Sequence, residues 1–343
     1  MWTHDLRTIR NNKHFRLLPY TSNISFQNND AACKFLPSLT RKQRMLCIRN
    51  PYVIEQIISG LKSATKECQN QFKHNLWNCS IVEKEFLTTQ IKIATRETAY
   101  IFALSSATVS RTIARACSEG KIASCSCGQQ PRRMSKQFIW AGCSHNVNYA
   151  NHFVRKFFDA VELENANDAR SMMNLHNNRV GREILKKNMR RECKCHGISG
   201  SCVMKTCWKV VAELERLAAV LKRKYANAAK IKAVTDGDSL ILKTERRSTG
   251  RTGRFLEYSR KLPNKNELVF LDDSPDYCIV DESKGVRGTQ NRECGQKCEK
   301  ICCGRGYRIV RSTVHEQCNC KFIWCCEVRC DICKKIVFHN FCF

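Results

Sequence analysis

Four cysteines enclose a short serine-containing loop in the segment Cys193-Lys-Cys-His-Gly-Ile-Ser-Gly-Ser-Cys202 and the following Cys207. Their order is nested, so bonds between Cys195 and Cys202 and between Cys193 and Cys207 would close one hairpin twice. On the chain-entropy relation the two loops contribute about 2.5 and about 3 kcal/mol, which supports a hairpin that has no core beneath it. The spacing therefore predicts a rigid hairpin over 193–207 whose tip presents Ser199 to solvent.

A second hairpin, over 318–333, is predicted from two further nested pairs, Cys320 with Cys330 and Cys318 with Cys333. Cys325 and Cys326 lie at its tip, together with the apolar residues Phe322, Trp324 and Val328. A loop tip normally avoids apolar side chains, so this one indicates a binding contact. The alternative is that these side chains cover a small core.

Two other kinds of chemistry use the same residue types. His196 lies close to Ser199, but no third orienting group is recognisable and glycines flank the serine, which argues against a nucleophile and its base. Cys330-x-x-Cys333 and Cys193-x-Cys195-His196 hold zinc-ligand residues, but no second Cys-x-x-Cys lies at finger or ribbon spacing. We therefore expect neither an enzyme nor a metal site.

Twenty-four cysteines in 343 residues indicate an oxidising compartment. Twelve lie up to Cys207 and twelve lie from Cys278 onward, which predicts two domains. The last 66 residues hold half of the cysteine, so we expect them to form a disulfide scaffold with little hydrophobic core. No stretch approaches the roughly 18 apolar residues of a membrane-spanning helix.

The first half of the chain has the periodicity of buried helices. Apolar residues recur at helical spacing at Ile54, Ile57, Ile58 and Leu61, and again at Val210, Val211, Leu214, Leu217 and Leu221. Residues 95–116 are rich in alanine, and 146–187 indicate a helix pair broken around Asn174–Asn178. These patterns predict a mainly α-helical domain over 33–234.

Turn chemistry predicts a linker over 235–265, where Asp-Gly-Asp, Arg-Arg-Ser-Thr-Gly-Arg-Thr-Gly-Arg and Pro-Asn-Lys-Asn follow one another. Residues 266–343 are expected to form the second domain, which begins with a strand over 267–271. The predicted fold class is two-domain and disulfide-rich, with a mainly α-helical N-terminal domain, a projecting stapled hairpin, and a small cystine-rich β/loop C-terminal domain.

The first 32 residues differ from the rest of the chain. Met1-Trp-Thr-His-Asp-Leu-Arg7 carries charge where a signal peptide needs an apolar run. Because the cysteine pattern implies secretion, we expect a truncated or misassigned start. Residues 1–32 are expected to be disordered.

Several motifs occur in a fixed order after the first 32 residues. They are Trp77-Asn-Cys-Ser80, the Ser199 hairpin, Ser274-Pro-Asp-Tyr-Cys278, Cys302-Cys-Gly-Arg-Gly-Tyr307 and Phe322-Ile-Trp-Cys-Cys326. Together they resemble the Wnt family of secreted, lipid-modified signalling ligands. The resemblance implies a covalent monounsaturated fatty acyl group on Ser199, added by a membrane-bound O-acyltransferase. Ser199 is then a substrate of another enzyme, and no other cofactor is expected.

The resemblance also implies partners. A Frizzled-type receptor would bind the acyl group and the second tip, at Phe322, Trp324, Cys325, Cys326 and Val328. A lipid-binding secretion carrier and a possible coreceptor complete the set. Three stretches, Thr95-Arg-Glu-Thr-Ala99, Leu175-His-Asn-Asn-Arg-Val-Gly181 and Cys207-Trp-Lys-Val210, resemble the branch usually linked to β-catenin-independent signalling.

Further disulfides follow from the resemblance and not from spacing. It joins Cys325 to Cys326, and it pairs Cys68 with Cys79, Cys117 with Cys125, Cys127 with Cys143, Cys278 with Cys303, Cys294 with Cys298, and Cys302 with Cys342. Cys33 and Cys47 remain as the last pair.

A formal net charge of +28 calls for an anionic partner. Lys222, Arg223 and Lys224 are candidates for binding heparan sulfate proteoglycans in the extracellular matrix, whereas nucleic acid is not expected for a secreted chain. The alternative is a solvated basic surface.

Asn23 and Asn78 are the asparagines of the two glycosylation sequons. Two other function classes stay open: a secreted heparin-binding matrix protein, and an intracellular metal- or nucleic-acid-binding protein.

Overall fold

The computed structural model describes residues 39–79, 93–131, 137–164, 168–236, 239–250, 253–258 and 263–343. The predicted N-terminal segment 1–32 and Cys33 lie outside these ranges. The chain forms two compact units: a helical unit, Met1–Gln71 with Ile81–Ser274, and a cystine-rich unit, Phe72–Ser80 with Pro275–Phe343. None of the helices in the described ranges has the length and apolar composition needed to span a bilayer.

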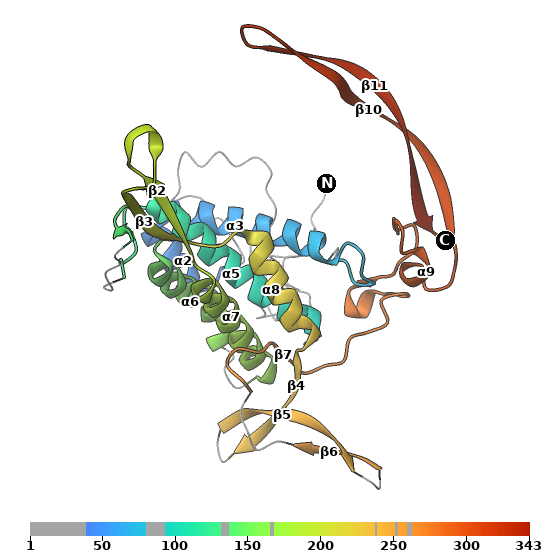
Figure 1. The fold of residues 1–343 in the computed structure, drawn as a ribbon. Helices are drawn as coiled ribbons and strands as arrows, with labels where there is room; N and C mark the ends of the chain where they lie inside the picture. The colour runs from blue at the N-terminus through green and yellow to red at the C-terminus, as the bar shows by residue number, and fades with distance from the viewer. Residues whose placement is uncertain are drawn as a thin grey trace, which may run out of the picture. The chain divides into compact units, whose positions relative to one another are not determined.

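Within its described residues, the helical unit contains six helices (Figure 1). They are α2 (Arg41–Arg49), α3 (Pro51–Phe72), α5 (Arg96–Ser118), α6 (Val147–Glu164), α7 (Ala169–Lys187) and α8 (Leu214–Ala226). Helix α5 contacts α6, α7 and α8. Its buried alanines let α7 come close: a Cβ on Gly181 of α7 would lie 2.0 Å from the carbonyl oxygen of Ala103. The small residues of α5 therefore set the helix spacing.

Helix α7 is continuous through 174–178, so the predicted break there is wrong. Helix α6 ends at Glu164 and α7 begins at Ala169. The asparagines read as turn residues are buried and have tertiary partners: Asn174 donates to Glu162 (3.2 Å), Asn178 donates to Asp159 (3.2 Å), and Asn177 bonds both main-chain groups of Val269 (3.0 Å each). Tertiary hydrogen bonds thus outweigh the turn preference of asparagine.

The predicted linker is also wrong, because most of it is sheet. Strands β4 (Ala229–Asp236), β5 (Ser239–Gly250), β6 (Gly253–Tyr258) and β7 (Val269–Phe270) lie in the order β6-β5-β4-β7. Strand β7 pairs in parallel with β4 and belongs to the helical unit, which extends to Ser274 instead of ending at 234. Main-chain strand pairing therefore forms a sheet from a segment whose amino-acid composition resembles a loop.

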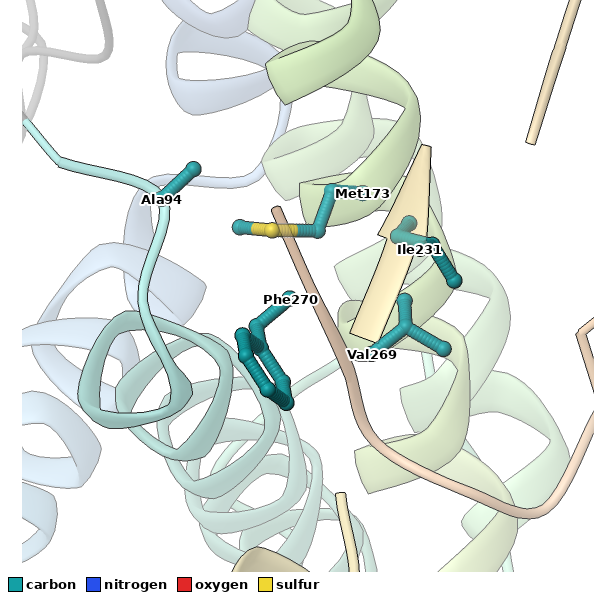
Figure 2. Packing of buried hydrophobic residues seen from close by; sticks show 5 residues of the cluster. All are labelled: Ala94, Met173, Ile231, Val269 and Phe270. Carbon is teal, nitrogen blue, oxygen red and sulfur yellow. The ribbon is translucent and has the colours of Figure 1, made fainter. Parts of the chain in front are cut away.

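A small apolar cluster anchors this sheet to the helices. Figure 2 shows Val269 and Phe270 of β7 beside Ile231 of β4 and Met173 of α7, with Ala94 nearby. Arg96 lies over the Phe270 ring at 5.1 Å. The cluster explains why the strand predicted over 267–271 joins the helical unit.

A three-stranded sheet carries the first predicted hairpin. Its strands are β1 (Ile139–Trp140), β2 (Arg190–Cys195) and β3 (Lys205–Val210), in the order β1-β3-β2. Val210 ends β3, so the helix predicted from Val210 begins only at Leu214. Leu217 and Leu221 are buried as the periodicity requires.

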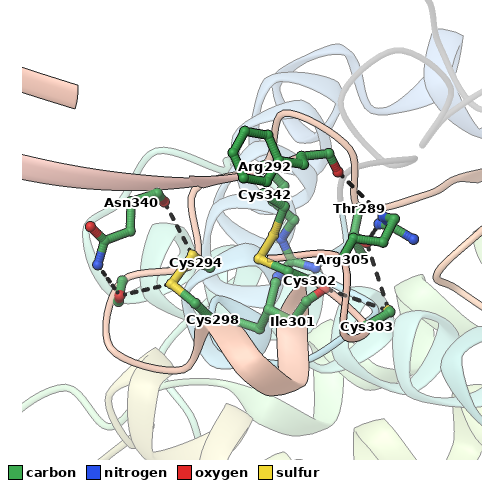
Figure 3. Close-up of a disulfide and its surroundings, with 12 residues drawn as sticks. Thr289, Arg292, Cys294, Cys298, Ile301, Cys302, Cys303, Arg305, Asn340 and Cys342 are labelled. Carbon is green, nitrogen blue, oxygen red and sulfur yellow. Dashed lines mark hydrogen bonds between the residues drawn. A yellow bond between two sulfur atoms is a disulfide. The ribbon is translucent and has the colours of Figure 1, made fainter. Parts of the chain in front are cut away.

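Disulfides dominate the interior of the cystine-rich unit (Figure 3). Cys294–Cys298 and Cys302–Cys342 surround the buried Ile301. The elements are β8 (Val280–Asp281), η2 (Glu282–Lys284), β9 (Val286–Arg287), α9 (Cys298–Ile301), β10 (Tyr307–Ile323) and β11 (Glu327–Cys342). Strands β10 and β11 form one long antiparallel ribbon. The predicted fold class, helical domain plus cystine-rich domain, is confirmed.

An early segment of the chain completes this unit. Phe72 and Trp77 are buried with their rings edge to face, 4.7 Å apart. The Arg292 guanidinium donates to the carbonyl oxygens of Lys73 (3.1 Å), Asn75 (2.6 Å) and Leu76. One side chain therefore joins residues 73–76 to a loop more than 200 positions later in the sequence.

Candidate functional site

The first hairpin is closed twice, as its nested cysteines suggest. Cys193 and Cys207 face each other across β2 and β3, with their Cα atoms 4.0 Å apart, and Cys195 is bonded to Cys202 nearer the tip. The loop beyond them is a single turn, η1 (Ile198–Gly200). The two disulfides fix the ends of this turn on a hairpin.

Ser199 occupies the exposed centre of that turn. Its backbone is left-handed, with φ 56° and ψ 27°. The amide of Gly197 donates to the carbonyl of Ser201 (2.8 Å), and a Cβ on Gly197 would lie 1.9 Å from the Ser201 hydroxyl. Glycine is thus required at position 197, and the side chain of Ser199 is exposed.

Three exposed apolar side chains lie close to Ser199 in the sequence of the hairpin. Ile198 is 93% exposed, Val203 is 90% exposed and Met204 is 54% exposed. Sequence reasoning singled out the serine and missed these neighbours, although three apolar residues within the short segment between Cys193 and Cys207 are themselves a signal. The arrangement presents a hydroxyl on an apolar tip.

The imidazole of His196 has a hydrogen-bond partner other than Ser199. Its Nε2 lies 2.7 Å from the Thr206 hydroxyl across the hairpin. The cluster of Cys294, Cys298 and Cys302 has metal-ligand spacing, but all three sulfurs are used in disulfides. These sulfurs are therefore not thiolate ligands.

The second tip closes the β10–β11 ribbon. Phe322 pairs with Val328 and Ile323 with Glu327. Trp324 in the turn is 91% exposed, so the alternative that it covers a small core is excluded. Cys318–Cys333 and Cys320–Cys330 cross-link the ribbon below the tip. One extra residue in β10 between Cys318 and Lys321 makes a bulge there.

The predicted Cys325–Cys326 disulfide is contradicted, because both thiols are free and exposed. Cys326 donates its S–H to the Cys325 sulfur at 3.4 Å, well beyond a covalent S–S length of about 2.05 Å. This donation raises the pKa of the Cys326 thiol. Both residues have positive φ, 94° and 140°, in a turn that keeps the sulfurs adjacent but unbonded.

Three further disulfides join the expected cysteines. Cys117 is bonded to Cys125, Cys127 to Cys143 and Cys278 to Cys303. Cys47, Cys68 and Cys79 are also disulfide-bonded.

The three basic candidates on α8 differ in their surroundings. The ammonium groups of Lys222 and Lys224 donate to the main-chain carbonyls of Gln71 and Asn266, whereas Arg223 is exposed. Of the sequon residues, Asn23 lies outside the described ranges, and Asn78 is half-buried between the buried Trp77 and Cys79. Arg223 is therefore the most accessible of the three cations.

Comparison with known proteins places these features in one family. The family model described as "wnt family" matches residues 35–343. Protein mom-2 of Caenorhabditis elegans is 44% identical over 339 residues, which cover 94% of this chain and 91% of mom-2. A chain of the solved structure of human WLS in complex with WNT8A is 37% identical, with a TM-score of 0.60, and the match covers 84% of this chain and 93% of that one. With two stapled hairpins on a helical and a cystine-rich unit, this chain belongs to the Wnt family of signalling proteins.

Proposed function

We propose that this Wnt-family signalling ligand is secreted and binds a Frizzled-type receptor through two contacts, a fatty acyl group on Ser199 and the apolar tip around Trp324. The observation that carries the proposal is the exposure of Ser199 in a rigid turn among Ile198, Val203 and Met204. An enzyme that transfers an acyl chain needs an accessible hydroxyl, and a chain attached there starts from an apolar platform.

The acyl group supplies the larger part of the binding energy. A chain of family type has about 14 methylene-like carbons, and full burial at about 0.8 kcal/mol each gives an upper limit of about 11 kcal/mol. Because a bilayer or a carrier buries the same carbons, the receptor gains only the difference. We propose that a membrane O-acyltransferase adds the chain and that a lipid-binding carrier accepts it, since the related structure contains WLS.

The second tip supplies selectivity. An acyl chain alone discriminates little between apolar grooves. Trp324, Phe322 and Val328 add a shaped contact on a ribbon that two disulfides stiffen. A secreted heparin-binding matrix protein, the alternative function, has no need of two exposed apolar tips.

Heparan sulfate is proposed as an accessory partner. Arg223 is the exposed cation of its cluster, and the chain has a formal net charge of +28. Neutralising Arg223 should weaken heparin binding and flatten its salt dependence while receptor affinity stays the same. Equal losses in both assays would place Arg223 in the receptor site.

The substitution that tests the main proposal must be compatible with the left-handed backbone conformation of Ser199. Alanine at φ 56° costs about 1 kcal/mol, whereas glycine adopts this conformation freely. Ser199→Gly therefore removes the hydroxyl without that penalty, and Ser201→Ala is the matched control because Ser201 is exposed with φ −61°.

The readouts are intact mass and affinity for an isolated receptor cysteine-rich domain. We expect Ser199→Gly to lose the acyl mass and at least about 100-fold in affinity, since even a quarter of the burial energy corresponds to that factor. Ser201→Ala should keep both. An unacylated protein of undiminished affinity would refute the acyl contact.

A further inference from the structure

One face of the β10–β11 ribbon carries exposed apolar side chains that no part of the described chain covers. In the register of the ribbon, Ile309, Phe338, Ile336 and Ile332 lie on the same side. Their exposed fractions are 63%, 66%, 47% and 73%. From Phe338 to Ile332 the stripe is about 20 Å long at 3.3 Å per residue. Contiguous exposed apolar surface of this kind marks a contact site.

The charges on this face have a single sign. It carries Arg311, which pairs with Phe338 across the ribbon, and His315, which pairs with Lys334. Between residues 307 and 317 and between 332 and 342 this face holds no carboxylate. Arg311, His315 and Lys334 are all exposed. Arg311 and Lys334 form no ion pair within the described residues. We refer to this side of the ribbon as the basic-apolar face.

The opposite face of the same strands is different. It holds Glu316, which pairs with Lys335 at 3.2 Å, and Asp331. His339 on that side binds Glu293 (2.8 Å) and Ser312 (3.0 Å). On this face the two cations Arg308 and Lys335 are balanced in number by Glu316 and Asp331, so the surplus positive charge of residues 307–318 and 331–342 belongs to the basic-apolar face.

We propose that the basic-apolar face binds the surface of an anionic phospholipid bilayer, with Ile332, Ile336 and Phe338 in the interfacial region and Arg311 and Lys334 among the headgroup phosphates. An anionic bilayer offers both apolar depth and negative charge over the length of the stripe. A sulfated polysaccharide offers the charge but nothing for four apolar side chains. The contact is independent of the acyl group, and it would align the ribbon along the membrane.

Binding is measured with the full-length Ser199→Gly protein, so that no acyl chain contributes. The probe is phosphatidylcholine vesicles with and without phosphatidylserine, followed by co-sedimentation over a range of salt. Ile332→Gln with Ile336→Gln should lower partitioning into anionic vesicles at least about tenfold. Arg311→Gln with Lys334→Gln should remove the dependence on phosphatidylserine and on salt.

The matched control is Val310→Gln with Val314→Gln, an apolar-to-glutamine change on the opposite face of the same ribbon, where both valines are exposed. It should bind like the parent. Circular dichroism and intact disulfide mass verify that every variant is folded, which is expected because all six positions are exposed.

Three results would overturn the proposal. One is equal partitioning of the parent and both face variants. A second is loss of heparin affinity in the Arg311/Lys334 variant with vesicle binding unchanged, which indicates a polysaccharide site. A third is loss of receptor affinity in the Ile332/Ile336 variant with vesicle binding unchanged, which indicates a protein interface. Because the acyl group is absent throughout, none of these results bears on the proposed role of Ser199.

Discussion

Glu162 is a buried acid of the helical unit, and replacing it with glutamine should stabilise that unit at neutral and alkaline pH. Its side chain is 4% exposed between α6 and α7, where Asn174 donates to it at 3.2 Å. Burial raises the pKa of Glu162 from 4.5 to about 7. A shift of that size corresponds to about 3 kcal/mol at about 1.36 kcal/mol per unit.

The sign of the effect follows from linkage. Between the unfolded pKa of 4.5 and the folded pKa of about 7, the folded protein retains a proton that the unfolded chain releases. The free energy of unfolding therefore falls as the pH rises through this window, and the full penalty is present above it. Glu162→Gln keeps an acceptor for Asn174 and removes the ionisation, so its gain in stability should grow with pH and reach about 3 kcal/mol.

Asp159, one helical turn earlier, is the contrasting control. Burial raises its pKa, but a two-fold contact with the Arg182 guanidinium, at 2.8 and 3.0 Å, opposes the shift. Asp159→Asn leaves the buried Arg182 without its counter-charge, which should cost about 3 to 5 kcal/mol. The two acid-to-amide changes are therefore expected to have opposite signs.

The assay is urea unfolding with the disulfides intact, followed by tryptophan fluorescence at a series of pH values from about 5 to about 8. The difference between Glu162→Gln and the parent should be small at the acidic end and largest at the alkaline end. Parallel profiles for the two proteins would refute the reasoning, because they would mean that Glu162 keeps its ordinary pKa in the folded state.

Three further predictions concern the tips and the helix packing. Trp324→Ala should lower receptor affinity about 30-fold, corresponding to about 2 kcal/mol for an aromatic anchor, while Val314→Ala, on the ribbon, should not; equal affinities would make the tip structural only. Thiol titration of the native protein should find the two free thiols of Cys325 and Cys326, and their joint replacement by serine should weaken receptor binding less than Trp324→Ala; a chain without free thiols would reinstate the disulfide between them. Gly181→Ala should unfold or severely destabilise the helical unit, because its Cβ would lie 2.0 Å from a main-chain oxygen of α5; a normal melting temperature would show that α7 can shift.

Sequence patterns correctly predicted the elements that are determined by interactions between residues close together in the chain. The spacing of Ile54, Ile57 and Leu61 predicted the buried face of α3, and the nested cysteines predicted both stapled hairpins. Each of these features depends on neighbours within a few turns or on one covalent bond. The residues that determine each of these elements therefore lie within the element itself, where a sequence pattern can reveal them.

The errors arose where distant partners decide the structure. Asn177 stays helical because it bonds the main chain of Val269, 92 residues away, and the same contact draws β7 into the helical unit. The positive φ of Ser199 could not be read from a Gly-Ile-Ser-Gly sequence that allows several turns. Cys325 and Cys326 are adjacent in every conformation, so only the geometry of the tip decides whether they are bonded.

The attachment of residues 72–80 to the cystine-rich unit sets an order of events during synthesis. Trp77 and Cys79 are made about 200 residues before the segment from Pro275 onward that helps to bury them. At about 5 to 20 residues per second, they wait roughly 10 to 40 seconds for those partners. During that interval the sequon at Asn78 is open to a glycosyltransferase and Cys79 is open to wrong partners. A chaperone or an oxidoreductase that holds this segment would therefore act before the second unit exists.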